Sequence, residues 1–227
     1  TDTATGTSST SETCMDSKNG SLKAGTSTYT HPAFWWDKDD DNVRESGEEL
    51  TGIWVGKFEV AFSNGYIIKP NETHLTNRNV STFYSEIYNM KSNNNNFGFS
   101  TSDEVHMIKN MEWGAVAYLS HSKYGTCING VCSEVQLNSV SNITGCGPQS
   151  NGSISTGSTC NAYNTDLGKL ASTTMNIYGI YDMSGGAFEF VMSNLVDSTG
   201  TMFSSNSGFS TYPNKRYYDK YSYGTSY

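Results

Sequence analysis

Apolar side chains recur at intervals of three and four residues along one stretch of the chain, residues 103–120. Val105, Ile108 and Leu119 belong to this series, and such spacing gathers side chains on one face of a helix. The polar tripeptide at residues 101–103 precedes the series and is typical of a helix N-cap. The pattern predicts a helix over residues 103–120, the clearest helix in the chain.

A second series of apolar positions predicts a shorter helix over residues 81–91. Phe83 and Met90 lie on one side of such a helix. Ser81 or Thr82 is the expected N-cap, because a hydroxyl side chain accepts a hydrogen bond from the first turn.

Outside these two segments the pattern is that of short strands and many turns. Ile53 and Val55 belong to a run at residues 50–62 that predicts a strand, and residues 66–69 predict a second one. Residues 125–227 have no further strong helical period and predict short strands and loops. The expected class is therefore α+β, with two helices and short antiparallel strands.

Composition agrees with a chain of loops and short strands, because Ser, Thr, Asn, Gly and Tyr dominate it. Residues 1–30 have few apolar anchors and are expected to form a linker or flexible arm. Residues 31–227 are expected to form one domain. Only 16% of the residues are charged and the net charge is -8, which argues against nucleic acid and anionic membranes as partners.

No apolar run reaches the roughly 18 residues of a membrane helix. The polar start of the chain also lacks the apolar region of a signal peptide. We therefore expect no membrane span in this chain, which looks like a mature piece or a fragment.

Two of the five cysteines flank a tight turn at residues 127–132. Asn129-Gly130 favours a two-residue hairpin turn. Such a turn places Cys127 and Cys132 opposite each other in a non-hydrogen-bonded pair, close enough for a disulfide. We therefore expect a bridge between them.

Cys146 and Cys160 bracket a loop rich in Gly and Ser. A bridge there would stabilise a segment that buries little surface, so we expect it as well. Cys14 is left over, which favours a partner outside this chain or in a missing part of it. The spacings do not fit a zinc site, and the pattern favours an oxidising compartment.

Three blocks of the chain resemble motifs of one known family. Residues 176–191 contain Tyr181-Asp-Met-Ser-Gly-Gly186, residues 50–60 contain an early strand, and residues 106–119 contain Glu112-Trp113. Residues 50–60 resemble the early strand of the formylglycine-generating enzyme (sulfatase-modifying factor) family, residues 106–119 resemble its second-helix motif, and residues 176–191, called the signature below, resemble its signature motif. Most of the chain is also similar to secreted or prepilin-linked surface proteins of bacteria.

The resemblance implies a C-type-lectin-like fold of the formylglycine-generating-enzyme type, without its last strands. In the enzymes, two copper-binding cysteines lie beyond the signature, whereas this chain has no cysteine after Cys160. Copper bound by thiolates therefore has no candidate ligands here. The resemblance thus implies the scaffold of the family without its oxidase chemistry.

The family signature also forms a structural calcium site. The resemblance places it at the Asp182 side chain, the carbonyls of Gly185 and Ala187, and the Glu189 carboxylate, which are oxygen ligands of the kind that calcium binds. A family asparagine is replaced by Gly186. The alternative from the residues alone is that Asp182 caps a turn while Glu189 bonds backbone amides.

A dense acidic run at residues 37–49 precedes the first predicted strand. Asp37, Asp39, Asp40, Asp41 and Asn42 follow the start of a calcium-loop pattern. The pattern continues with a glycine and a bidentate glutamate and is incomplete here, so we expect a solvated acidic loop.

A second candidate cation position lies at Asn164 and Asp166, where a turn is the favoured interpretation. No catalytic constellation stands out, because the four histidines show no metal-ligand spacing. His106 is expected to be a packing residue.

The tryptophans are expected to pack rather than to bind sugars. Trp54 and Trp113 lie in periodic contexts that favour the core. Trp35 and Trp36 are neighbours in sequence and cannot both face one side of a strand, so that one of them is expected to be exposed.

The stretch at residues 212–227 is rich in tyrosine among Ser, Asn and Gly. Binding loops favour this composition, because a tyrosine ring gives contact area at low entropic cost. An edge strand with cross-strand tyrosine pairs is the alternative. The candidate ligand-binding residues are Tyr212, Tyr217, Tyr218, Tyr221 and Tyr223.

These observations favour a non-catalytic domain, extracellular or on a bacterial cell surface, that binds a glycan or protein ligand, as in adhesion. Structural calcium is the expected cofactor. The alternative is a subunit of a pilus-like filament or surface assembly, in which neighbouring copies satisfy Cys14 and the incomplete sheet. A formylglycine-type oxidase is the third hypothesis.

Overall fold

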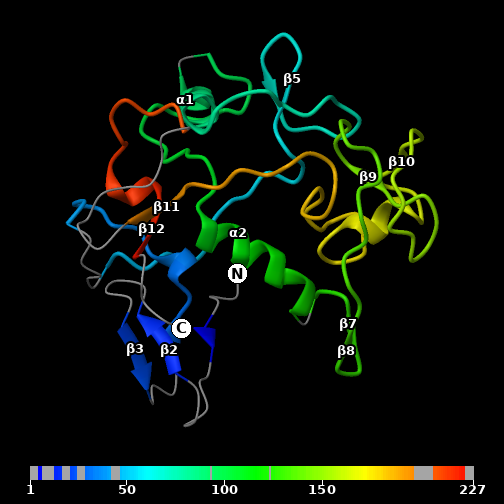
Figure 1. The fold of residues 1–227 in the computed structure, drawn as a ribbon, viewed down its shortest axis with the longest axis horizontal. Coiled ribbons are helices and arrows are strands. Elements are labelled where there is room, and N and C mark those ends of the chain that lie inside the picture. Colours follow the sequence, from blue (N-terminus) through cyan, green and yellow to red (C-terminus); the bar gives the residue numbers. More distant parts are fainter. Residues whose placement is uncertain are drawn as a thin grey trace.

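In its described residues, the computed structural model has two α-helices and six short strand pairs, joined by long loops (Figure 1). This confirms the predicted α+β class with two helices. Five of the six pairs are antiparallel. The structure describes residues 5–6, 13–16, 21–24, 29–41, 47–92, 94–122, 124–196 and 207–222.

Helix α1 spans Val80–Tyr88 and begins one residue earlier than predicted. Its N-cap is Asn79, whose Oδ1 accepts a hydrogen bond from the Thr82 N–H at 2.9 Å. The hydroxyls of Ser81 and Thr82 donate to the same oxygen. The prediction of Ser81 or Thr82 as the cap is therefore wrong, because both hydroxyls reinforce the asparagine cap.

Helix α2 spans only Asn110–Ala117, so the prediction that it begins at Asp103 is wrong. The Asp103 carboxylate closes a turn by accepting the Ser100 N–H at 2.8 Å. The Ile108 carbonyl accepts the Met192 N–H at 2.9 Å. This long-range pairing keeps the preceding segment extended, although its apolar spacing favours a helix.

Four strands form two antiparallel pairs within the predicted arm of residues 1–30. β1 (Thr5–Gly6) pairs with β4 (Tyr29–Thr30), and β2 (Thr13–Asp16) pairs with β3 (Ser21–Ala24). Cys14 lies in β2, but its side chain is outside the described part of the structure. The prediction of its partner therefore stays a prediction.

The predicted strand at residues 50–62 forms a ladder only at its end. β5 (Ala61–Phe62) pairs with β6 (Tyr66–Ile67). Earlier in the segment, the Lys57 carbonyl accepts the Tyr181 N–H at 2.9 Å, so this part is fixed by the signature. The expectation that Trp54 packs in the core is wrong, because its side chain is fully exposed.

Both predicted disulfides are present. Cys127–Cys132 joins β7 (Cys127–Ile128) to β8 (Val131–Cys132). Asn129 and Gly130 have positive φ values of 51° and 80°, as the predicted hairpin turn requires.

The second bridge, Cys146–Cys160, lies where β9 (Cys146–Gly147) pairs with β10 (Asn161–Ala162). It closes the base of the Gly/Ser-rich loop between these two strands. Both disulfides are compatible with an extracellular location.

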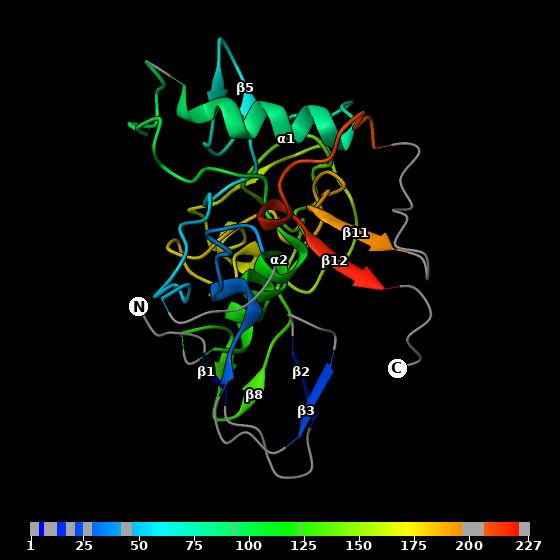
Figure 2. The ribbon, with the colours of Figure 1, turned by 90° about the vertical axis from the view of Figure 1, so that its left-hand side faces the viewer.

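The exception to the antiparallel pairing lies near the C-terminus. β11 (Ser193–Val196) and β12 (Asp219–Ser222) run parallel, side by side (Figure 2). Residues 182–192 join the buried Tyr181 to the start of β11. They therefore connect the interior to the β11–β12 pair.

Two aromatic clusters form the interior. Phe58 stacks on Tyr181 with ring centroids 5.2 Å apart, and Ala171 packs against both. In the second cluster the Trp36 ring lies 5.6 Å from the Tyr217 ring, edge to face. The first cluster includes Tyr181 of the signature. The second includes Trp36, which directly precedes the acidic run.

Candidate functional site

Three carboxylates converge in the acidic run. One oxygen each from Asp37, Asp39 and Glu48 lies within 4.8 Å of the other two. Asp37 and Glu48 are buried, and Asp39 is exposed. Carboxylates this close repel one another, most strongly away from bulk water. We call these three residues the acidic cluster, and they could hold a metal ion.

Neighbouring N–H groups orient the acidic cluster. The Trp35 indole donates to Glu48 Oε2 at 2.9 Å, and the Lys38 backbone N–H donates to Glu48 Oε1 at 2.8 Å. The Asp41 N–H donates to Asp37 Oδ1 at 3.1 Å. The end of the loop is thereby folded back over its beginning.

The expectation of a solvated loop is wrong for Asp37 and Glu48, which are buried. Counting from Asp37 as position 1, Asp39 stands at position 3, Asp41 at position 5 and Glu48 at position 12. These are carboxylate positions of a twelve-residue calcium loop. Sequence reasoning missed Glu48, which this count finds.

The glycine of the pattern is Asn42 in this chain. Asparagine is the residue that, after glycine, most readily adopts the left-handed backbone that the sharp turn needs. Residues 42–46 lie outside the described residues, so that the middle of the loop is known from its sequence alone.

The acidic loop is docked on the segment that carries the candidate tyrosines. The Arg216 N–H donates to Asp40 Oδ1 at 3.1 Å. Trp36, next to Asp37, packs against Tyr217. The loop therefore contacts this segment at Arg216 and Tyr217.

In the signature, Asp182 is 1% exposed and accepts hydrogen bonds from three N–H groups. Asn138 Nδ2 and the Gly145 N–H both donate to Oδ1 at 2.8 Å, and the Glu59 N–H donates to Oδ2 at 3.3 Å. Burial raises the pKa of Asp182, and the bonds from Gly145 and Asn138 oppose that shift. Asp182 thus joins three separate segments of the chain.

Glu189 lies against the second carboxylate of this region, Glu59. The Trp113 indole donates to the Glu189 carboxylate. Burial, together with Glu59 and Asp182, raises the pKa of Glu189 from 4.5 to about 7. The sequence predicts that Trp113 packs in the core. The side chain is half-buried, and its indole N–H also forms the hydrogen bond to Glu189.

His74 lies against one of these carboxylates. Its side chain is buried, and Nδ1 contacts the Glu59 carboxylate. Burial lowers the pKa of His74, but the hydrogen bond and charge of Glu59 raise it more, so that the net shift is upward. Sequence reasoning missed this pairing, which no local spacing reveals.

His74 also packs against Gly186. Gly186 has a positive φ of 70°, and a Cβ atom there would lie 3.2 Å from His74 Cε1. The imidazole ring thus occupies the space that a side chain at position 186 would need.

Three of the four predicted calcium ligands of the signature lie along one hollow of about 260 Å³. Its wall includes Gly185, Ala187 and Glu189, while Asp182 does not contribute to it. The oxygens of Asp182 already accept three N–H groups. Calcium at Asp182, Gly185, Ala187 and Glu189 stays a prediction.

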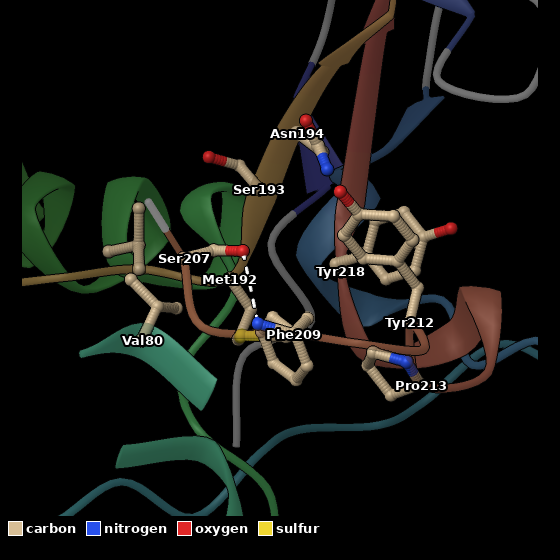
Figure 3. A pocket seen from close by; sticks show the side chains of 10 residues that line it. Val80, Met192, Ser193, Asn194, Ser207, Phe209, Tyr212, Pro213 and Tyr218 are labelled. Atoms are coloured by element: carbon tan, nitrogen blue, oxygen red, sulfur yellow. Dashed lines mark hydrogen bonds between the residues drawn. The ribbon is translucent and has the colours of Figure 1, made fainter. Parts of the chain in front are cut away.

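The candidate ligand-binding tyrosines lie in different surroundings. Tyr212 and Tyr218 line a hollow beside β11 (Figure 3). Tyr217 is buried in the second aromatic cluster, and the Tyr221 hydroxyl accepts a hydrogen bond from Asn110 Nδ2 at 2.8 Å. Tyr223 lies outside the described residues.

The remaining candidates have structural contacts. His106 bonds to Glu112 at 3.1 Å, in agreement with its predicted packing role. The Thr165 N–H donates to the Ala162 carbonyl in the turn that carries Asn164, and the exposed Asp166 pairs with Lys169. Trp36 is buried and Trp35 is half-buried.

Among the residues that the structure describes, none forms a helix long and apolar enough to cross a membrane. In comparisons with known proteins, no family model matches the chain, and neither a curated protein nor a solved structure does.

Proposed function

We propose that this chain is a non-catalytic extracellular domain that binds a ligand at a cell surface. In this proposal its scaffold is C-type-lectin-like and is stabilised by two disulfides and one structural calcium ion. The observation that carries the proposal is the convergence of Asp37, Asp39 and Glu48 within 4.8 Å, at positions 1, 3 and 12 of a calcium-loop pattern.

The ligand type of the acidic cluster favours calcium over transition metals. Calcium takes about six to eight oxygen ligands, and zinc or copper sites use thiolate or imidazole ligands. The acidic cluster consists of carboxylates alone. In the proposal calcium binds there, whereas in the signature Asp182 accepts N–H groups and Glu59 contacts His74.

The cysteines support a role without catalysis. Four of the five are joined in the disulfides Cys127–Cys132 and Cys146–Cys160. An oxidase that binds copper through two thiolates needs two reduced cysteines close together. Asp182 and Glu189, the acidic residues of the signature, accept hydrogen bonds from buried N–H groups.

The docking of the acidic loop relates calcium to ligand binding. Asp40 accepts the backbone N–H of Arg216. Arg216 lies between Tyr212 and Tyr218, which both line the hollow. A calcium ion that orders the loop would also fix this wall of the hollow. The proposal therefore implies that ligand binding depends on calcium.

The test is an array of cell-surface glycans and extracellular proteins, probed with the full chain in calcium and again in EDTA. The proposal expects binding of at least one class of ligand, and weaker binding in EDTA. Asp39→Asn should mimic EDTA, whereas Glu134→Gln, which removes an exposed charge elsewhere, should not. A complete lack of binding on both arrays would contradict the proposal.

A further inference from the structure

The hollow beside β11 is built from three parts of the chain (Figure 3). Val80 lies at the start of α1. Asn194 lies in β11, and Met192 directly precedes that strand. Phe209 and Tyr212 belong to the loop before β12. Its volume is about 90 Å³. A space of this size receives one edge of a small ring rather than a whole drug-sized molecule.

Hydrogen bonds fix the walls of the hollow. The Ser81 N–H donates to the Ser207 carbonyl at 2.9 Å, which ties the loop to α1. The Asp219 N–H donates to the Met192 carbonyl at 3.0 Å, which ties β12 to the opposite wall. A preformed wall lowers the entropic cost of binding a small ligand.

The lining combines aromatic rings with an amide and hydroxyls. Tyr212 and Tyr218 present two rings, and Phe209 lies 6.0 Å from Tyr212 between ring centroids. Figure 3 shows the Asn194 side chain beside the overlapping rings of Tyr212 and Tyr218. Aromatic faces cover the C–H face of a sugar ring, while an amide and hydroxyls bond its hydroxyl groups.

The charge of the lining limits the ligand class further. The ten described residues that line the hollow include no charged side chain. The net charge of the chain is -8, which repels anionic ligands. A carboxylated or phosphorylated sugar would therefore find no counter-charge in this hollow.

We propose that this hollow binds one edge of an uncharged sugar ring, with Tyr212 and Tyr218 against the ring and Asn194 bonded to its hydroxyls. This inference rests on the proposed function and names its ligand class. It needs no metal ion in contact with the sugar, because the lining itself supplies both the aromatic faces and the polar groups.

The test follows the backbone and Asn side-chain NMR signals of the full chain in calcium during titration with three probes. Two are neutral, methyl glucoside and N-acetylglucosamine, and the third is sialic acid. We expect at least one neutral sugar to shift the signals of Asn194 and Phe209, with Kd near about 1 mM. Sialic acid should leave these signals unchanged.

Two variants locate the site. Tyr212→Ala should weaken the neutral sugar about tenfold, as expected for the loss of one stacked ring. Tyr178→Ala removes a tyrosine outside the hollow that is more exposed than Tyr212, and it should leave the affinity unchanged. Equal affinities of the two variants would overturn the assignment to this hollow.

Other outcomes separate this inference from the proposed function. If neither neutral sugar shifts Asn194 or Phe209, the sugar assignment is wrong. A proline-rich peptide that binds there instead would overturn the sugar class and leave a binding domain in place. Failure of the array experiment, in contrast, would remove the proposed function itself.

Discussion

The acidic cluster and the signature both gather carboxylates, but they balance the negative charge in different ways. In the signature, Asp182 accepts three N–H groups, and the buried His74 contacts Glu59. In the acidic cluster, Glu48 and Asp37 also accept N–H groups, but three carboxylate oxygens lie within 4.8 Å of one another, and Asp39 is exposed. N–H donors therefore occur in both regions, and the convergence of three carboxylates is the feature of the acidic cluster that favours a cation.

The resemblance places calcium at the signature, and our proposal places it at the acidic cluster, whose three carboxylates could hold a metal ion. Four experiments test this contrast.

The largest expected effect comes from Asp182→Ala. The N–H groups of Asn138, Gly145 and Glu59 would lose their acceptor in the interior, and we expect a loss of about 3 kcal/mol in the free energy of unfolding. Urea denaturation followed by circular dichroism measures it. Asp166→Ala, at an exposed turn, should change stability by less than about 0.5 kcal/mol. Equal effects would show that Asp182 is no structural acceptor.

Calcium should stabilise the folded chain. At one hundred times its Kd, a ligand adds about 2.7 kcal/mol, which raises Tm by about 5–10 °C for a domain of this size. Differential scanning calorimetry with calcium and with EDTA measures the shift. Asp39→Asn should abolish it, and Glu134→Gln should preserve it.

Gly186→Ala tests the contact between the signature and His74. The positive φ costs about 1–2 kcal/mol for a residue with a Cβ atom, and the new methyl group would lie 3.2 Å from His74 Cε1. Gly152→Ala is the matched control, because Gly152 has a φ of 75° with no atom within 4 Å of the added Cβ. A lower Tm for Gly186→Ala than for Gly152→Ala is expected. Equal values would remove the role given to His74.

The smallest effect is a dependence of stability on pH without calcium. The folded chain raises the pKa of Glu189 from 4.5 to about 7, so that folding favours its protonated form. This contribution is fully present below pH 4.5 and is lost as the pH rises through 7. The raised pKa of His74 acts in the same direction.

Tm measured in EDTA should therefore fall between pH 6 and pH 7.5. Glu189→Gln cannot titrate and should reduce this slope. A slope of the opposite sign in the unmodified chain would contradict the account of the signature.

Local chemistry was predictable from the sequence. The Asn129-Gly130 turn fixes its own backbone, so that the bridge between Cys127 and Cys132 follows from the residues around it. The two helices follow from apolar spacing in the same way. The exact start of α2 does not follow from this spacing, because the Ile108 carbonyl, just before the helix, accepts the N–H of the distant Met192.

The candidate site depends more on distant residues. Asp182 is bonded to Gly145 and Glu59, and His74 packs against Gly186. These contacts join residues that are far apart in the sequence, so residue spacing does not predict them. Glu48 was partly predictable from the sequence. It lies at position 12 when Asp37 is counted as position 1, as in a twelve-residue calcium loop, although position 6 is Asn42 instead of glycine.

Isothermal titration of calcium into the full chain and into Asp39→Asn and Glu189→Gln distinguishes the acidic cluster from the signature as the calcium site. We expect one site in the unmodified chain, retained in Glu189→Gln and lost in Asp39→Asn. Calcium binding that is lost in Glu189→Gln and retained in Asp39→Asn would contradict this expectation and place the ion in the signature.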